Sequence, residues 1–253
     1  MVTVKEISDF INSFAPYSTQ CEWDNCGILI GDKDKSVKKI GYVLDLTSEV
    51  LKDATEKGVD LIITHHPVIF RAQKNFLKGN IAYEAASKNI SVLSAHTCFD
   101  CAEGGVNDVL CDVLGIRNPV GVPSESCSVP MARIGDIDEM SSLVFAEMVS
   151  KKLDVPCRVV DCGKIIKKVA VCGGAGAEFL SDAVRMGADA YVTGEMDHHE
   201  LLLADELGVT VVLAGHFETE NPSMCVLKDR ICDKFSETEA VILAQKNPVK
   251  YVY

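Results

Sequence analysis

The chain has 253 residues, 47% of them hydrophobic and 25% charged, and a net charge of −12 at pH 7. This composition is that of a globular protein with a sizeable core, long enough for one large α/β domain or two smaller ones. The negative charge disfavours a general nucleic-acid binder or anionic-membrane binder, because phosphates would be repelled overall.

No apolar stretch approaches the roughly 18 residues that would indicate a membrane span. The first residues, Met1 to Glu6, lack the basic region and the apolar core of a signal peptide. We therefore expect a cytoplasmic protein without membrane contact. The eleven cysteines are accordingly expected to be reduced. Cys98 and Cys101 form a CxxC pair, but no second pair follows, so a structural zinc or a redox pair is only a minor alternative.

Short apolar runs alternate with amphipathic segments along the first half of the chain. A helix is predicted over Val4–Phe14, and a loop that contains Trp23-Asp24-Asn25-Cys26-Gly27 follows it. Apolar runs typical of buried strands cover 40–46, Leu61–Thr64 and 90–95. The segments between these runs have helical patterns.

The second half begins after a stretch rich in Pro and Ser, 118–129, which is the best candidate for a linker. A strand is predicted over 132–137, a helix over 140–153 and a further strand over 157–161. The last part, 222–252, is predicted to form a helix and a final strand.

The chain contains an internal duplication. The stretch 53–64 resembles 182–193, because the Asp-Ala, Gly, Asp and Thr positions coincide. Each copy follows one apolar run and precedes another, which ends in a small residue, a histidine and a carboxylate four positions later. The pattern predicts a βαβαβ unit present twice. In such sheets, ligands bind just beyond the carboxyl ends of the strands.

All six histidines follow the ends of four apolar runs. They are His65 and His66, His96, His198 and His199, and His216. Two runs add a carboxylate, giving the pairs His96/Asp100 and His216/Glu220, which face the same way on a helical turn. Each pair alone could be a core histidine or a carboxylate at a helix start. Their repetition favours a divalent metal site, for which imidazoles and carboxylates are the ligands.

The number of candidate ligands favours two ions. Three imidazoles and two carboxylates exceed what one catalytic zinc takes while keeping an open position. A carboxylate has two oxygens and can bridge, so Glu220 or Asp100 could be shared. Two adjacent ions can turn water into a nucleophile and polarise the group it attacks. Nitrogen and oxygen ligands without thiolate suit Zn, Fe, Mn and Co alike.

Other residues are candidates for contacts with a substrate. His198 and His199 stand where His65 and His66 stand in the first repeat, and could transfer protons or simply begin a helix. Gly174 and Gly176 lie in a strand-to-helix turn whose amides could hold a phosphate, although such turns are common. Arg71 could pair with an anion or be solvated.

Several motifs together identify a family. They are, in order, Trp23-Asp24-Asn25-x-Gly27, Thr64-His65-His66-Pro67 with Phe70, Ala95-His96-Thr97-x-x-Asp100, Gly173-Gly174-x-Gly176, Gly194-Glu195 and Gly215-His216-x-x-Thr219-Glu220. They resemble the motifs of the GTP cyclohydrolase I type 2 homologues, the Nif-three-like family. The resemblance runs from about Ile7 to Val252, and Cys98 departs from it where a polar residue is usual.

The resemblance implies an α/β fold class with two three-layer α/β domains of similar topology and mixed sheets. The metal-binding domain would comprise 1–125 and 215–253, and 126–214 would form an inserted second domain. It also implies a homohexameric ring and two divalent metal ions per chain.

Carried over residue by residue, the implied metal ligands are His65, His66, Asp100, His216 and Glu220. Glu220 would bridge the two ions. His66 and Asp100 would complete the coordination of one ion. His65 and His216 would complete that of the other. His96 would lie close by and orient a ligand.

The function that follows is a metal-dependent hydrolase for a nucleotide or a related phosphate-bearing small molecule. Cyclohydrolase chemistry on GTP would also need an acid that protonates the departing nitrogen, and His198, His199 or Glu195 could serve. The alternative is a metal-binding ring protein without catalysis, either a metallochaperone or an adaptor for a protein or nucleic acid. The negative charge disfavours the nucleic-acid version.

Overall fold

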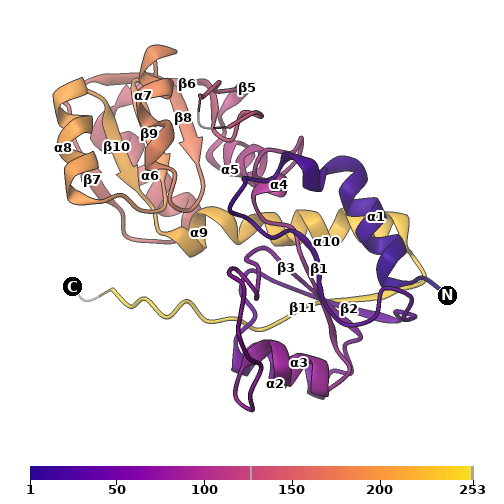
Figure 1. Ribbon diagram of the computed structural model, residues 1–253. Helices are drawn as coiled ribbons and strands as arrows, with labels where there is room; N and C mark the ends of the chain where they lie inside the picture. The colour runs from indigo at the N-terminus through magenta and orange to yellow at the C-terminus, as the bar shows by residue number, and fades with distance from the viewer. Residues whose placement is uncertain (126, 252–253) are drawn as a thin grey trace. The chain divides into compact units, whose positions relative to one another are not determined.

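The computed structural model describes residues 1–125 and 127–251 (Figure 1). Their contacts divide the chain into two α/β units, each described by itself below. Unit 1 comprises Met1–Glu103 and Met224–Pro248; unit 2 comprises Gly104–Ser223 and the last described residues, from Val249 onward. Unit 1 is therefore discontinuous in the sequence.

Unit 1 is built on a five-stranded mixed sheet with the strand order β1-β4-β3-β2-β11. Its strands are β1 (Gly27–Ile30), β2 (Lys39–Val43), β3 (Leu61–Thr64), β4 (Ser91–Ser94) and β11 (Glu239–Ile242). The four strands from β4 to β11 in this order run parallel, and β1 is antiparallel to β4 at the edge. The three inner strands β2, β3 and β4 are almost wholly buried, as their continuous apolar runs predict.

Helices cover both faces of this sheet. They are α1 (Val4–Phe14), α2 (Ser48–Glu56), α3 (Ile81–Ser87), α4 (Thr97–Asp100) and α10 (Pro222–Lys234), with a 3₁₀ turn η1 (Tyr17–Thr19). Helices α2 and α3 lie on one face, and α1 and α10 lie on the other (Figure 1). Thr3 and Glu6 form a capping box that fixes the start of α1 at the predicted residue. Unit 1 is therefore a three-layer α/β unit.

Unit 2 is built on a six-stranded mixed sheet with the strand order β5-β6-β8-β9-β10-β7. Its strands are β5 (Arg117–Gly121), β6 (Arg133–Ser141), β7 (Arg158–Val160), β8 (Ile165–Cys172), β9 (Ala190–Thr193) and β10 (Thr210–Leu213). Strands β8, β9 and β10 run parallel. The pairs β5–β6, β6–β8 and β7–β10 are antiparallel.

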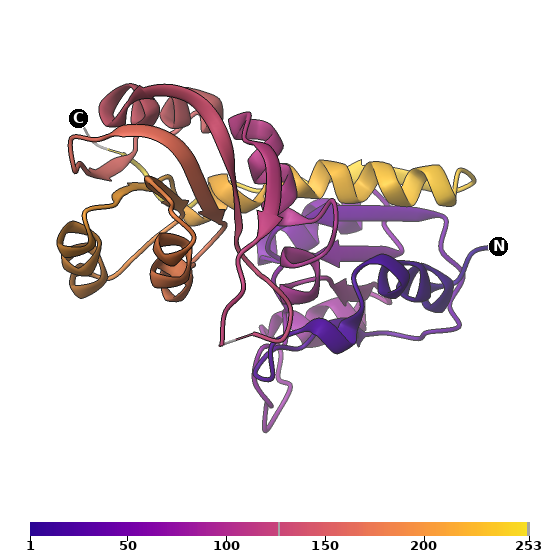
Figure 2. The ribbon, with the colours of Figure 1, turned by 90° about the horizontal axis from the view of Figure 1, so that it is seen from above.

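The helices of unit 2 also form two outer layers. They are α5 (Val106–Leu114), α6 (Ser142–Leu153), α7 (Leu180–Arg185), α8 (His198–Leu207) and α9 (His216–Glu220), with a 3₁₀ turn η2 (Ala177–Phe179). Leu110 of α5 and Phe145 of α6 belong to one buried cluster with Val171 of the sheet. Helices α7 and α8, in orange, lie on the opposite face from α6 (Figure 2).

The succession β2-α2-β3-α3-β4 of unit 1 recurs in unit 2 as β8-α7-β9-α8-β10. Within each unit the three strands are parallel and adjacent, in the order first, second, third. An antiparallel edge strand pairs with the third strand in both, β1 with β4 and β7 with β10. The predicted duplication is therefore present as two similar βαβαβ cores.

By their contacts the units divide at 103/104 and 223/224, and the domain boundaries that the resemblance implies, 125/126 and 214/215, stay a prediction that differs from this division. Two elements account for the first difference. Strand β5 lies in the expected linker and pairs with β6, and α5 contributes to the buried cluster of unit 2. An edge strand tolerates Pro119, since its neighbour on one side is solvent. Residue 126, the expected boundary, lies outside the described residues.

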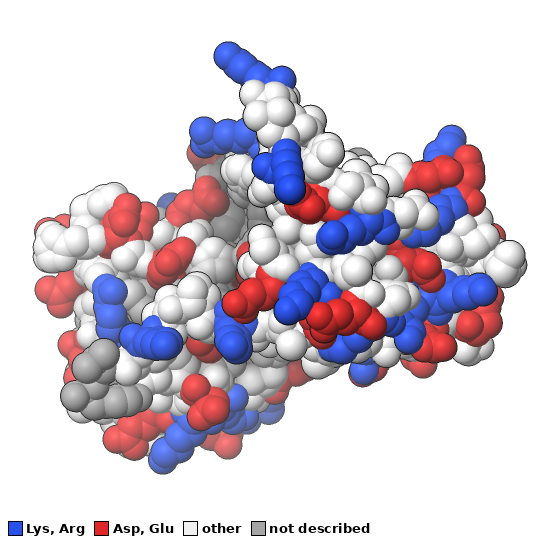
Figure 3. Space-filling model, turned by 90° about the horizontal axis from the view of Figure 1, so that it is seen from below, with Lys and Arg blue, Asp and Glu red and all other residues white. Residues whose placement is uncertain are grey.

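No helix among residues 1–125 and 127–251 is both long and apolar enough to cross a bilayer. On the face shown in Figure 3, Lys and Arg side chains are intermixed with Asp and Glu side chains.

Candidate functional site

Three histidines of unit 1 gather where two strands end. Strands β3 and β4 are parallel neighbours, so their carboxyl ends meet at one edge, where His65, His66 and His96 follow them. The ring centroids lie 5.0 Å apart for His65 and His66, 5.0 Å for His65 and His96, and 5.3 Å for His66 and His96. One ring nitrogen of each lies within 4.8 Å of the others. The predicted cluster of imidazoles is present.

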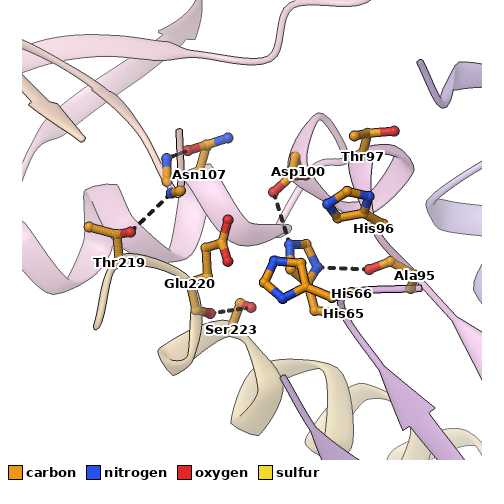
Figure 4. A network of polar contacts seen from close by, with 12 residues as sticks. His65, His66, Ala95, His96, Thr97, Asp100, Asn107, Thr219, Glu220 and Ser223 are labelled. Atoms are coloured by element: carbon orange, nitrogen blue, oxygen red, sulfur yellow. Dashed lines mark hydrogen bonds and ion pairs between the residues drawn. The ribbon is translucent and has the colours of Figure 1, made fainter. Parts of the chain in front are cut away.

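The first two imidazoles have one ring nitrogen fixed by an oxygen acceptor. Nδ1 of His65 lies 2.9 Å from the carbonyl oxygen of Ala95 (Figure 4). Because a carbonyl can only accept, Nδ1 carries the hydrogen and Nε2 keeps its lone pair. Nδ1 of His66 lies 2.7 Å from Oδ1 of Asp45. Both rings therefore present Nε2 as the nitrogen that can bind a metal.

Asp45 follows strand β2 and is fixed by the segment after β11. Its Oδ2 accepts a hydrogen bond from Nε2 of Gln245 at 2.6 Å. Its backbone amide donates to Oε1 of the same glutamine at 3.0 Å. The returning C-terminal segment of unit 1 thus holds the carboxylate that orients His66.

His96 is oriented in the same way from the loop before β1. Its Nδ1 lies 2.8 Å from Oδ1 of Asp24, whose Oδ2 accepts from the amide of Thr97 at 3.0 Å and from the Thr97 hydroxyl. Burial opposes ionisation of Asp24, but the hydrogen bonds from His96 and Thr97 hold its pKa well below the usual range. The loop therefore keeps a charged acceptor against the His96 ring.

Asp100, the last residue of α4, extends the cluster. Its Oδ1 lies 3.6 Å from Nε2 of His65 (Figure 4), and both residues are buried. Two ligand atoms about 2.1 Å from one ion, at a tetrahedral angle, are about 3.4 Å apart. The two atoms are thus spaced as ligands of one ion would be.

A second group of candidate ligands lies in unit 2, after strand β10. His216 begins the short helix α9 and Glu220 ends it, so the two residues are four apart on one turn. Nε2 of His216 lies 3.2 Å from Oε2 of Glu220. Nδ1 of His216 lies 2.8 Å from Oε1 of Glu195, which follows β9. His216 is thus oriented by a carboxylate, like His66 and His96.

The turn after β8 makes room for Glu220. A Cβ atom on Gly174 would lie 2.2 Å from Oε1 of Glu220 and 3.0 Å from Nε2 of His216. A Cβ atom on Gly173 would lie 3.1 Å from Cγ of Glu220. Gly174 also has φ +63°, which favours glycine. The glycines therefore let the backbone approach the carboxylate.

The amides of this turn are bonded within unit 2. Gly173 donates to Oδ1 of Asn107 at 2.8 Å, and Gly174 donates to Oγ1 of Thr219 at 3.0 Å. Gly176 donates to Oγ1 of Thr193 at 3.1 Å. These amides are therefore engaged within unit 2, and phosphate binding by Gly174 and Gly176 stays a prediction.

The remaining candidates stand apart from these contacts. His198 and His199 are the exposed first residues of α8, directly after the capping residue Asp197. Arg71 is exposed in the loop between β3 and α3. Glu195, expected as an acid, serves as the acceptor for His216.

Sequence reasoning missed the acceptors Asp45 and Asp24 and the residue that fixes Asp45, Gln245. A signal existed for two of them. Asp45 interrupts the end of the apolar run 40–46, which precedes the His65 run, and Asp24 lies within the Trp-Asp-Asn motif. Gln245 stands in a polar segment 200 residues from its partner and carried no such signal.

Comparisons with known proteins agree on one relationship. The family model described as Duf34/NIF3 (NGG1p interacting factor 3) matches residues 2–248. A protein of Clostridium perfringens, named GTP cyclohydrolase 1 type 2 homolog, is 31% identical over 98% of this chain and 99% of its own length. A protein of Methanocaldococcus jannaschii with the same name is 35% identical over 85% of this chain and 89% of its own length.

Solved structures share the architecture. A Bacillus cereus protein related to NIF3 matches with a TM-score of 0.91 and 23% identity, covering 100% of this chain and 99% of that chain, which shows the fold alone. Reduced HcgD from Methanocaldococcus jannaschii matches with a TM-score of 0.83 and 32% identity, covering 96% of this chain and 98% of that chain.

Proposed function

This chain belongs to the Duf34/NIF3 family, and from that membership we propose that it binds two divalent metal ions and hydrolyses a nucleotide or a related phosphate-bearing small molecule. The name shared by the relatives, GTP cyclohydrolase 1 type 2 homolog, supports a hydrolytic reaction on such a compound. The donor groups of each unit support the metal site.

One observation carries the proposal. The four imidazoles His65, His66, His96 and His216 each have Nδ1 within 2.7–2.9 Å of a carbonyl or carboxylate oxygen. In metal sites a ligating histidine almost always donates its second ring N–H to such an acceptor, which fixes the ring and raises its basicity. A chain in which four imidazoles share this arrangement fits metal binding better than packing alone.

The proposed ligands are those that the family resemblance implied. In unit 1 they are His65, His66 and Asp100. In unit 2 they are His216 and Glu220, with Glu220 as the bridging carboxylate. The proposal is that both groups serve one dinuclear centre, with His96 beside it.

The residues of the chain would prepare the site as follows. When bound, the metal ions would supply an activated water as nucleophile and would polarise the bond that is attacked. Asp45 and Glu195 keep the proton on Nδ1 of His66 and His216, so that Nε2 of each can serve as a ligand, and Asp24 orients His96 beside them. His198 and His199 are proposed to exchange protons with the substrate, and Arg71 to bind its anionic group.

Metal analysis of the native protein tests the centre. We expect close to two transition-metal ions per chain, of Zn, Fe, Mn or Co, and a clear loss in the His65→Ala and Glu220→Ala variants. His199→Ala and Glu206→Ala remove an imidazole and a carboxylate from the exposed helix α8, so they should keep the full metal content. Unchanged metal content in both ligand variants would remove the assignment.

A substrate screen tests the reaction. Metal-loaded protein is incubated with GTP, other nucleotides and phosphodiesters, and saturable turnover that Glu220→Ala abolishes would support the hydrolase. Exchangeable metal without turnover would instead favour a metallochaperone or an adaptor. The homohexameric ring is part of the proposal, and the mass of the assembly in solution tests it independently.

A further inference from the structure

We propose that Trp23 and Phe70 form a platform on which a planar heteroaromatic ring of the substrate stacks, beside the imidazoles of unit 1. Unit 1 would thus recognise a ring of nucleobase size in the substrate. The inference rests on the proposed function, which it deepens from a phosphate-bearing compound to one that carries such a ring.

The two side chains form an angled pair of aromatic rings next to the histidine cluster, so a planar ring that stacks on one of them also contacts the other. Their ring centroids lie 5.6 Å apart with an interplanar angle of 51°. The His96 ring lies 5.9 Å from Trp23 and 6.5 Å from Phe70, edge-on to both. A ring seated on this surface would therefore lie within reach of the proposed metal site.

Both rings are open to solvent. Trp23 is 56% exposed and Phe70 is 44% exposed. Tryptophan is highly buried on average, because exposing so large an apolar surface is unfavourable. An exposed aromatic pair beside polar, site-forming residues is the kind of surface that marks a binding site.

The chain holds Trp23 in place through its next two neighbours. Asp24 is fixed by His96 and Thr97, as described above. Nδ2 of Asn25 donates to the carbonyl oxygen of Ile69 at 2.7 Å, which ties the Trp23 loop to the segment that carries Phe70. The two rings thus come from segments that are bonded to each other, and a surface fixed before binding loses less entropy when the ligand arrives.

The chemistry of the surface favours a flat aromatic ring. Stacking between an aromatic side chain and a base contributes about 1–3 kcal/mol and tolerates different bases, because every base has a π face. Arg71 follows Phe70 directly and is exposed, so its guanidinium is available for a phosphate on the same molecule. A nucleotide combines both groups.

The test uses the chain's single tryptophan, Trp23, as the reporter. The metal-loaded full-length protein is titrated with guanosine monophosphate, and with ribose 5-phosphate, which carries the sugar and phosphate without the ring. We expect saturable quenching of Trp23 emission by the nucleotide only. Equal quenching by ribose 5-phosphate, or none by either compound, would overturn the proposal.

Matched variants separate stacking from a general effect of the loop. Phe70→Leu should weaken nucleotide binding about tenfold, the equivalent of about 1.4 kcal/mol. Phe70→Tyr should restore it, since the ring remains. Phe76→Leu removes another exposed phenylalanine, 46% exposed, from the same loop and should leave the dissociation constant unchanged. An unchanged constant in Phe70→Leu would contradict the platform.

Metal content measured on the same samples distinguishes this inference from the proposed function. Native protein with the expected metal but without ring-dependent quenching would remove the platform and leave the metal centre. Ring-dependent quenching in protein that binds no metal would leave the platform and remove the metal-dependent hydrolase.

Discussion

Asp60 and Asp189 make the same pair of hydrogen bonds in the two units. Oδ2 of Asp60 accepts from the two amides of 38–39, at 2.9 and 3.1 Å. Oδ2 of Asp189 accepts from the two amides of 167–168, both at 2.9 Å. Each aspartate directly precedes the second strand of its βαβαβ core and binds the first strand next to it. The duplication thus extends from strand order to individual side-chain contacts.

Replacing either aspartate should loosen the first strand of its own unit. Asp60→Ala and Asp189→Ala each remove an acceptor shared by two amides, at a cost of about 2 kcal/mol. Hydrogen exchange is expected to rise at 38–39 in the first variant and at 167–168 in the second. Glu56→Ala, at the exposed end of α2, serves as the control. Equal exchange in the variants and the native protein would contradict the prediction.

The two βαβαβ cores could be predicted from the sequence because the patterns that indicate them are local. Continuous apolar runs and the shared Asp, Gly and Thr positions indicated parallel strands, and the strand ends indicated where ligands would gather. Strand β5 was missed because Pro119 and its neighbours have the composition of a loop. Its strand conformation depends on pairing with β6, which is a tertiary contact.

In the candidate site, too, local contacts could be predicted from the sequence and contacts between distant segments could not. Spacing alone predicted the turn that joins His216 and Glu220, since four residues make one helical turn. The acceptors of the imidazoles come from distant loops, as with Asp24, which is 72 residues from His96. No periodic pattern encodes such a contact, so the orienting carboxylates could be found only in the folded chain.

Asp45 should control metal affinity through His66. Asp45→Ala removes the acceptor of Nδ1, and the loss of such an orienting partner typically lowers metal affinity about 10–100-fold. Competition with a chromogenic chelator measures the affinity. The control is Asp53→Ala. Oδ2 of Asp53 accepts a hydrogen bond from the amide of Ala244, so its loss should loosen the same C-terminal segment while the bond between Asp45 and His66 remains. Equal affinity in both variants would argue against the orienting role.

Gly174 should be required for the position of Glu220. In Gly174→Ala the new methyl group would clash with the carboxylate of Glu220. The left-handed backbone conformation of this position would also cost the alanine about 1–2 kcal/mol. We expect reduced metal content together with reduced stability. Gly187→Ala is the matched control, because Gly187 has φ +86° and nothing lies within 4 Å of its added Cβ. That variant should lose stability but keep its metal, and a loss of metal there would show that strain alone is responsible.

The buried thiol of Cys111 should make the protein less stable at alkaline pH. Burial raises the pKa of its thiol to about 12, whereas an unfolded cysteine titrates near 8.5. Because the pKa is higher in the folded state, the contribution of Cys111 to the free energy of unfolding is complete below about pH 8.5. It declines as the pH rises toward 12, at up to about 1.4 kcal/mol per pH unit.

The variant Cys111→Ala isolates this effect. At pH 7 it should be less stable than the native protein by about 1 kcal/mol, because a buried group is lost from the core of unit 2. The difference should shrink above about pH 8.5 and reverse in sign by about pH 10, because the native protein then loses about 2 kcal/mol through Cys111 and the variant does not. Denaturant unfolding with reduced thiols measures this change. A difference that stays constant over this range would show that Cys111 does not titrate as described.

The discontinuity of unit 1 has a consequence for the order in which the protein is made. Strand β11 completes the sheet beside β2, and α10 contributes the buried Leu227 and Ile231, yet both elements follow nearly all of unit 2 in the order of synthesis. Nearly all of unit 2 lies earlier in the nascent chain and is contiguous, so it can fold while translation continues. The sheet of unit 1 is therefore completed only after most of unit 2 has been made, and until then its β2 edge is open to other strands.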